Sequence, residues 1–187
     1  MWKFFFRMSG WKVDTSLPEG IDRCVMIAVP HTSNWDFPFA MGAFRILKIP
    51  LKFTIKKEWF RFPFNLFFKP LGGLAINRTP KKEGEKRRSM VDAMADLFSQ
   101  HKKLAVMVTP EGSRSKRDEW RTGFYYTAQK AGVPIGLGYL DFKNKIAGVG
   151  KMIYPTDFEK DMREIMNFYR DKEGHSPEKF ALDKRFA

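Results

Sequence analysis

The segment PHTSNWD carries the two residues best suited to acid–base chemistry, a histidine and an aspartate separated by four residues. His31 follows the apolar run CVMIAV, which predicts a strand over 24–29, and Asp36 stands where a helix over 36–48 is expected to begin. On one regular helix the two side chains would point about 140° apart. They meet only if the chain turns between them, and the intervening Thr, Ser and Asn residues favour such a turn.

Two interpretations of this pair follow from the residues alone. In the catalytic one, Asp36 accepts a hydrogen bond from one imidazole nitrogen, and the other nitrogen removes a proton from a substrate hydroxyl. In the structural one, Asp36 is an ordinary helix N-cap beside a surface histidine. Ser33 and Ser113 are alternative nucleophiles, but neither lies in the Gly-x-Ser-x-Gly turn that exposes a catalytic serine.

Metal chemistry and disulfides are not expected. The histidines, at positions 31, 101 and 175, are scattered and show no zinc-ligand spacing with the single cysteine. Cys24 lies in an apolar run, which favours packing, and a lone cysteine fits a reducing compartment. No apolar run reaches the roughly 18 residues that cross a bilayer, and Arg7 interrupts the first one before it suits a signal peptide. We therefore expect the protein to remain on the cytoplasmic side of the membrane.

The elements that must position these residues alternate along the chain, whose 187 residues predict one domain. Strands are expected at 24–29, 51–55, 74–77, 104–108 and 134–140. A helix is expected over 84–100, and another from Thr156 with Glu159 in the capping-box position. This alternation predicts an α/β sandwich with a mostly parallel central sheet flanked by helices, with functional residues on the loops that follow strands. The polar tail over 174–187 is expected to fray.

The chain is strongly basic, with 34 Lys and Arg against 21 Asp and Glu and a net charge of +13. Such a charge favours nucleic acid, anionic lipid headgroups or phosphorylated substrates without choosing among them. Aromatics and cations interleave in WKFFFR at 2–7 and WFRFPFNLFFK at 59–69, which suits a protein lying on a bilayer, with residues 1–12 as a membrane-surface segment. The alternatives are a core helix broken at Pro63 and stacking on single-stranded nucleic acid.

Four short motifs occur in order along the chain. They are HTSNWD at 31–36, GGLAINR at 72–78, PEGSRS at 110–115 and VPI at 133–135. Together they resemble the four motifs of the glycerolipid acyltransferases, the family of the lysophosphatidic acid acyltransferases. The chain departs from the usual pattern of that family at Pro30, at Ala75 and at the glycines 136 and 138.

The resemblance implies a glycerol-3-phosphate acyltransferase-like fold and the transfer of a fatty acyl group from acyl-CoA or acyl-carrier protein to a lipid hydroxyl in phospholipid biosynthesis. The default acceptor is a lysophospholipid such as 1-acylglycerol-3-phosphate. No cofactor and no nucleic acid partner is implied. The enzyme would act as a peripheral protein on the inner face of the cell membrane. The alternative is a basic non-catalytic protein that binds anionic membrane or RNA.

The resemblance also implies that His31 is the general base and that Asp36 is its partner. Histidine suits this role because its pKa of about 6.5 leaves much of it neutral near physiological pH. The imidazole would return the proton to the departing thiolate, so no acyl-enzyme is required. Backbone amides near Gly112 or in the second motif are candidate donors to the tetrahedral oxyanion.

The implied substrate-binding residues are Arg78, Glu111, Gly112, Ser113 and Arg114. Arg78 and Arg114 would bind the phosphate of the acceptor. Glu111 either binds substrate hydroxyls or braces its loop by accepting backbone amides. The alternative for Arg114 is a surface salt bridge to Asp118 or Glu119, and Arg78 precedes the solvated charge run KKEGEKRR.

Overall fold

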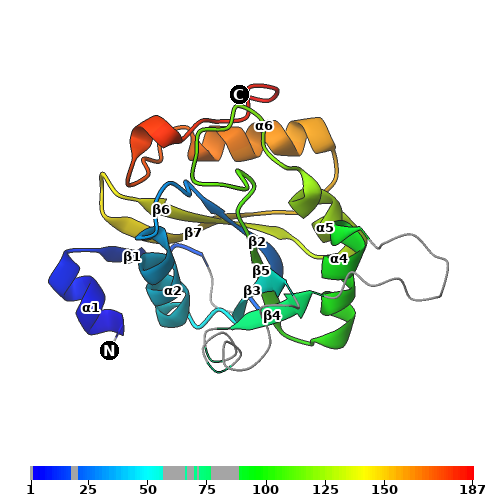
Figure 1. Ribbon diagram of the computed structural model, residues 1–187, viewed down its shortest axis with the longest axis horizontal. Helices are drawn as coiled ribbons and strands as arrows, with labels where there is room; N and C mark the ends of the chain where they lie inside the picture. Colours follow the sequence, from blue (N-terminus) through cyan, green and yellow to red (C-terminus); the bar gives the residue numbers. More distant parts are fainter. Residues whose placement is uncertain (1, 18–20, 57–65, 67–69, 71, 77–88) are drawn as a thin grey trace.

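The centre of the molecule is a seven-stranded sheet in the order β1-β7-β6-β2-β5-β3-β4 (Figure 1). The computed structural model describes residues 2–17, 21–56, 66, 70, 72–76 and 89–187. The strands are β1 Lys12–Asp14, β2 Arg23–Val29, β3 Leu51–Lys56, β4 Gly73–Ile76, β5 Leu104–Val108, β6 Ile135–Asp141 and β7 Ile146–Ile153. Neighbouring strands are parallel except for the antiparallel pair β6 and β7. The predicted α/β fold with a mostly parallel sheet is confirmed.

The five predicted strands all occur, with ends that differ from the prediction by at most one residue. β1 and β7 were not predicted. In β7 the sequence IAGVGKMI breaks the apolar pattern, but its glycines allow close packing rather than marking a loop. A Cβ at Gly148 would lie 2.7 Å from Asp14 Cβ, and a Cβ at Gly150 would lie 2.5 Å from the Phe168 ring. The strand forms because it pairs with β6 on one side and with β1 on the other.

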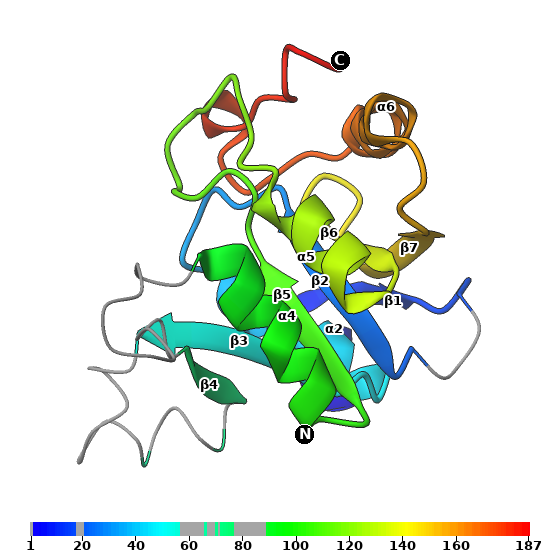
Figure 2. The same cartoon turned by 90° about the vertical axis from the view of Figure 1, so that its right-hand side faces the viewer.

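Helices cover both faces of the sheet (Figures 1 and 2). They are α1 Trp2–Ser9, α2 Asp36–Ile46, α4 Met90–Gln100, α5 Gly123–Ala131, α6 Phe158–Tyr169 and the 3-10 helix η2 Pro177–Lys179. α1 and α2 share one buried cluster, and α4, α5 and α6 share the cluster on the opposite face. Residues 84–88 of the predicted helix over 84–100 lie outside the described residues. The capping box at Thr156 is wrong, because the Asp157 carboxylate caps α6 and accepts from Lys160 N at 2.9 Å.

β2 is buried on both faces, as is typical of a central parallel strand. Val25 and Ile27 belong to the cluster under α4, α5 and α6, whereas Cys24 and Met26 belong to the cluster under α1 and α2. Burial raises the pKa of the Cys24 thiol to about 12. The predicted packing role of this cysteine is therefore confirmed.

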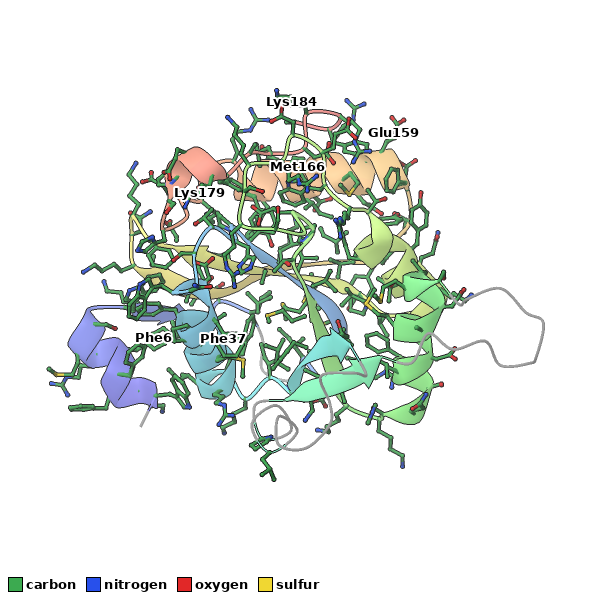
Figure 3. All side chains as sticks on the ribbon, viewed as in Figure 1. Phe6, Phe37, Glu159, Met166, Lys179 and Lys184 are labelled. Carbon is green, nitrogen blue, oxygen red and sulfur yellow. The ribbon has the colours of Figure 1, made fainter. Side chains whose placement is uncertain are left out.

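The N-terminal segment forms α1, one side of which is part of the protein interior. Phe6 lies between α1 and α2 and is buried (Figure 3). α2 accommodates this ring at Gly42, where a Cβ would lie 2.6 Å from Phe6 Cε2. Among the described residues, no helix is both long enough and apolar enough to cross a bilayer.

The expectation that the tail over 174–187 frays is wrong. Gly174 is buried, and Asp183 has no exposed surface. The tail is polar in sequence, but hydrogen bonds that involve Ala181, Asp183 and Arg185 attach it to the loop over 109–122.

Candidate active site

The loop from Pro30 to Trp35 joins β2 to α2 and turns sharply, as its composition predicted. The turn is closed by hydrogen bonds from Asp36 N to the Ser33 oxygen at 3.4 Å and from Phe37 N to the Asn34 oxygen at 3.3 Å. The peptide bond between Val29 and Pro30 is cis. The turn brings the start of α2 back beside the end of β2.

The Asp36 carboxylate lies at the centre of this turn and is 4% exposed. Its Oδ2 atom accepts hydrogen bonds from Thr32 N and Ser33 N, both at 2.8 Å, and lies 3.1 Å from His31 Nδ1. The structural interpretation, in which Asp36 is the helix N-cap, is wrong. Trp35 occupies the N-cap position and makes no side-chain capping bond, so the carboxylate caps the loop instead.

This contact favours one tautomer of the neutral His31 imidazole. A carboxylate only accepts hydrogen bonds, so Nδ1 carries the proton and Nε2 keeps its lone pair. Nε2 has no hydrogen-bond partner among the described residues. His31 and Asp36 both line a cavity of about 930 Å³. The arrangement can therefore take a proton from a group that enters the cavity.

Glu111 links the His31 loop to the loop over 109–122 that follows β5. Its Oε2 atom accepts a hydrogen bond from His31 N at 2.8 Å, while Oε1 is buried without a partner among the described residues. Burial raises the pKa of Glu111 to about 8; the His31 amide lowers it and the nearby Asp36 carboxylate raises it. Of the two roles expected for Glu111, this geometry matches the bracing one, because Glu111 does not line the cavity.

Gly112 and Ser113 follow Glu111 in a tight turn. Gly112 has a φ of +70°, which favours glycine, and a Cβ there would lie 2.9 Å from Arg121 Nε and would displace that side chain. Its amide donates to the Thr109 oxygen at 3.0 Å and is therefore not free to bind an oxyanion. The Ser113 hydroxyl pairs with that of Ser115 at 2.9 Å, and Ser113 does not line the cavity.

Two guanidinium groups lie on the cavity wall, those of Arg114 and Arg121. Asp118 and Glu119, the alternative partners considered for Arg114, are paired with cations of the C-terminal segment instead. Among the described residues neither arginine forms an ion pair. Arg121 was missed by sequence reasoning, since the turn at Gly112 that places it on the wall depends on a backbone angle. Its only sequence signal is a cation between the third motif and the helix that follows.

The rest of the cavity wall is mostly apolar and curves around the carboxyl end of the sheet. On the α2 face it is formed by Phe37, Ala40, Phe44, Phe53 and Met107. On the α4 and α5 face it is formed by Met90, Met94, Val108 and Phe124. The departure from the family pattern at Gly138 has a physical reason here, because a Cβ there would lie 2.9 Å from the Ile27 backbone oxygen and 3.1 Å from Phe44 Cζ.

Other predicted residues fall partly outside the described chain. Arg78 lies outside the described residues, and so does the segment 59–69 except for Leu66. The described part of the second motif begins β4, and Gly72 there has a φ of +94°. No group of three or more His, Cys, Asp or Glu residues that could hold a metal ion occurs in the described part of the chain.

Comparison with known proteins places this site in a family. The sequence model of the family described as Acyltransferase matches residues 13–136, more than half of the chain. The chain belongs to this acyltransferase family. The match includes all four motifs and both loops that form the site. No curated protein matches the sequence.

The fold of this acyltransferase is similar to the crystal structure of the 1-acyl-sn-glycerophosphate (LPA) acyltransferase PlsC from Thermotoga maritima. The TM-score is 0.58 at 16% sequence identity, and the alignment covers 89% of this chain and 73% of the other. At this identity the likeness concerns the fold, and the site residues are argued from their own geometry.

The raised pKa of Glu111 predicts a pH dependence of stability. Because the pKa in the folded protein, about 8, lies above the ordinary value of 4.5, the folded state holds an extra proton between these values. The free energy of unfolding therefore falls as pH rises through this range, by at most about 1.4 kcal/mol per pH unit. Glu111→Gln keeps an acceptor for His31 N but cannot ionise, so its stability relative to wild type should increase with pH.

Urea unfolding at about pH 5 and about pH 8 measures this difference. Glu119→Gln, which changes an exposed residue of the same loop, is the matched control and should show no such trend. A difference between wild type and Glu111→Gln that is constant with pH would contradict the assignment of the raised pKa.

Proposed function

We propose that this acyltransferase moves a fatty acyl group from acyl-CoA or acyl-carrier protein to the hydroxyl of a lysophospholipid such as 1-acylglycerol-3-phosphate. The observation that carries the proposal is the His31–Asp36 pair at a cavity with apolar walls and two arginines, where Nε2 has no partner from the described part of the chain. The acceptor named for the structurally similar Thermotoga maritima protein supports the same choice.

The proposed reaction uses His31 first as a base and then as an acid. Nε2 removes the proton from the acceptor hydroxyl as its oxygen attacks the thioester carbonyl. Asp36 stabilises the resulting imidazolium through Nδ1 and keeps the ring oriented. When the tetrahedral intermediate collapses, the C–S bond breaks and the thiolate takes the proton from Nε2. The histidine is then ready for another cycle, and no residue is acylated.

Recognition of a phosphate by Arg114 and Arg121 fits their chemistry. One guanidinium group can bind two phosphate oxygens at once. Both arginine side chains are exposed at the cavity without a carboxylate partner among the described residues. The apolar wall suits acyl chains, because methionine and phenylalanine side chains gain from burial against hydrocarbon. One cavity thus offers a charged part for the acceptor headgroup and an apolar part for fatty chains.

A membrane surface is the proposed location, on the inner face of the cell membrane. The outer side of α1 exposes Phe4 (68%) and Met8 (72%) next to the exposed cations Lys3 and Arg7. Apolar side chains flanked by cations suit insertion at the headgroup boundary of an anionic bilayer. A lysophospholipid acceptor would be drawn from the same surface.

His31→Ala should lower acyl transfer by at least about a hundredfold, because the general base is removed. Thiol release from acyl-CoA in the presence of 1-acylglycerol-3-phosphate, with mass spectrometry of the lipid product, measures the change. His101→Ala, at the end of α4 and away from the cavity, is the matched control and should keep full activity. Undiminished transfer by a folded His31→Ala protein would exclude the base assignment.

Replacing Phe4 and Met8 by serine should weaken binding to anionic phospholipid vesicles by about tenfold, since two apolar side chains no longer enter the bilayer. Vesicle co-sedimentation measures this. Tyr154→Ser, which removes an equally exposed ring (69%) elsewhere, should leave vesicle binding unchanged. Equal losses from both variants would show that α1 is not the contact surface.

A further inference from the structure

The chain beyond α6 returns across both loops that form the active site. In Figures 1 and 2 the C-terminal segment lies beside the loop over 109–122, and Figure 3 labels Lys184 in this region. Residues 173–185 are called the strap below. The family model matches residues 13–136, and the strap lies beyond the matched residues. It is nevertheless anchored by buried polar contacts.

The first anchor holds the His31 loop. Ser176 N donates a hydrogen bond to Thr32 Oγ1 at 3.1 Å, and Thr32 is buried one residue after His31. Gly174 packs so closely that a Cβ there would lie 2.8 Å from Thr32 Oγ1 and 3.0 Å from Pro30 Cβ. The strap therefore touches the chain on both sides of the catalytic histidine.

The second anchor holds the loop over 109–122 and centres on Asp183. Its fully buried carboxylate accepts from Trp120 N at 3.0 Å and from Arg185 Nη2 at 2.7 Å. Arg185 Nη2 also donates to the Trp120 oxygen at 2.8 Å, and Trp120 Nε1 donates to the Ala181 oxygen at 3.0 Å. Both backbone polar groups of Trp120 are thus bound by the strap. Trp120 directly precedes Arg121, whose guanidinium lies on the cavity wall.

Charge stabilises this second anchor. Burial raises the pKa of Asp183, but hydrogen bonds from Arg185 and Trp120 outweigh it and leave the pKa below the ordinary value. Asp183 is therefore a buried carboxylate whose partners are an arginine and two backbone amides, and removing its charge leaves Arg185 without its closest partner. Two further contacts, Lys184 N to the Asp118 oxygen at 2.9 Å and Lys184 Nζ to Asp118 Oδ2 at 2.5 Å, extend the attachment.

We propose that the strap positions the two active-site loops relative to each other and that Asp183 is a positioning residue for the acceptor site. Inside the site the loops are joined by the bond from His31 N to Glu111 Oε2, which is a single hydrogen bond. The strap adds a second connection on the outside, from Thr32 to Trp120. With both in place, the imidazole and the Arg121 guanidinium keep a fixed separation, as transfer to one hydroxyl of a phosphorylated acceptor requires.

The test compares wild type with Asp183→Asn in steady-state kinetics and in amide hydrogen exchange. The kinetic part rests on the proposed function, with 1-acylglycerol-3-phosphate as acceptor and acyl-CoA as donor. We expect Asp183→Asn to raise the KM for the acceptor about tenfold and to leave the KM for the donor within about twofold. Arg121→Ala is the positive control and should raise the acceptor KM in the same way.

Hydrogen exchange gives a result that does not depend on turnover. In Asp183→Asn the amides of residues 111–122 should exchange faster, whereas those of β2 and β6 should be unchanged. If wild type transfers no acyl group to 1-acylglycerol-3-phosphate, the proposed function is wrong. The exchange rates of residues 111–122 still test whether the strap positions the loops. If Asp183→Asn does not fold, Thr32→Val tests the other anchor without removing a backbone donor. It should raise the acceptor KM and speed exchange of the amides of the His31 loop.

Two controls separate positioning from a general loss of stability. Ile135→Val truncates a buried side chain at the opposite end of the sheet, and Asp171→Asn removes an exposed carboxylate next to the strap. Both should keep the wild-type acceptor KM. The proposal is overturned if exchange over 111–122 and the acceptor KM are unchanged in Asp183→Asn, if the donor KM rises equally, or if Ile135→Val reproduces the effect.

Discussion

One carboxylate oxygen, Asp36 Oδ2, fixes the geometry on which the site depends. It accepts two backbone amides of the turn and faces His31 Nδ1, so the same atom shapes the loop and selects the tautomer. Because Asp36 is buried, these donors replace part of the hydrogen bonding that its carboxylate would have in water. The turn formed by the four intervening residues thus lets the carboxylate reach back to the imidazole.

The position of the second loop follows from the sheet. β2 and β5 are parallel neighbours, so their carboxyl ends lie side by side and the loops that follow them meet. Glu111 crosses this short distance and binds the amide of His31, and its neighbours place Arg114 and Arg121 on the cavity wall. Residues that lie 80 positions apart in the sequence thereby form one site. A buried Glu111 with a raised pKa adds no second negative charge beside Asp36 at neutral pH.

Much of this architecture could be predicted from the sequence because it depends on local patterns. The apolar runs of β2 and β5 and the turn residues after His31 determine where the histidine and the aspartate lie. β7 could not be predicted from its own residues. Its glycines interrupt the apolar pattern, and the reason for them is the close packing of Asp14 and Phe168, which lie far away in the sequence. Arg121 and Asp183 were missed for the same reason: their contacts depend on a left-handed glycine and on a tail whose composition is polar. Arg78 and most of the segment 59–69 stay predictions, because they lie outside the described residues.

The central claim is that Asp36 holds His31 with its proton on Nδ1 and its lone pair on Nε2. Nitrogen-15 NMR of the histidine ring, assigned with His101→Gln and His175→Gln variants, measures the tautomer directly. We expect a protonated Nδ1 and an unprotonated Nε2 for neutral His31, and loss of this preference in Asp36→Ala. A wild-type ring protonated on Nε2, or one whose tautomer is unchanged in Asp36→Ala, would contradict it.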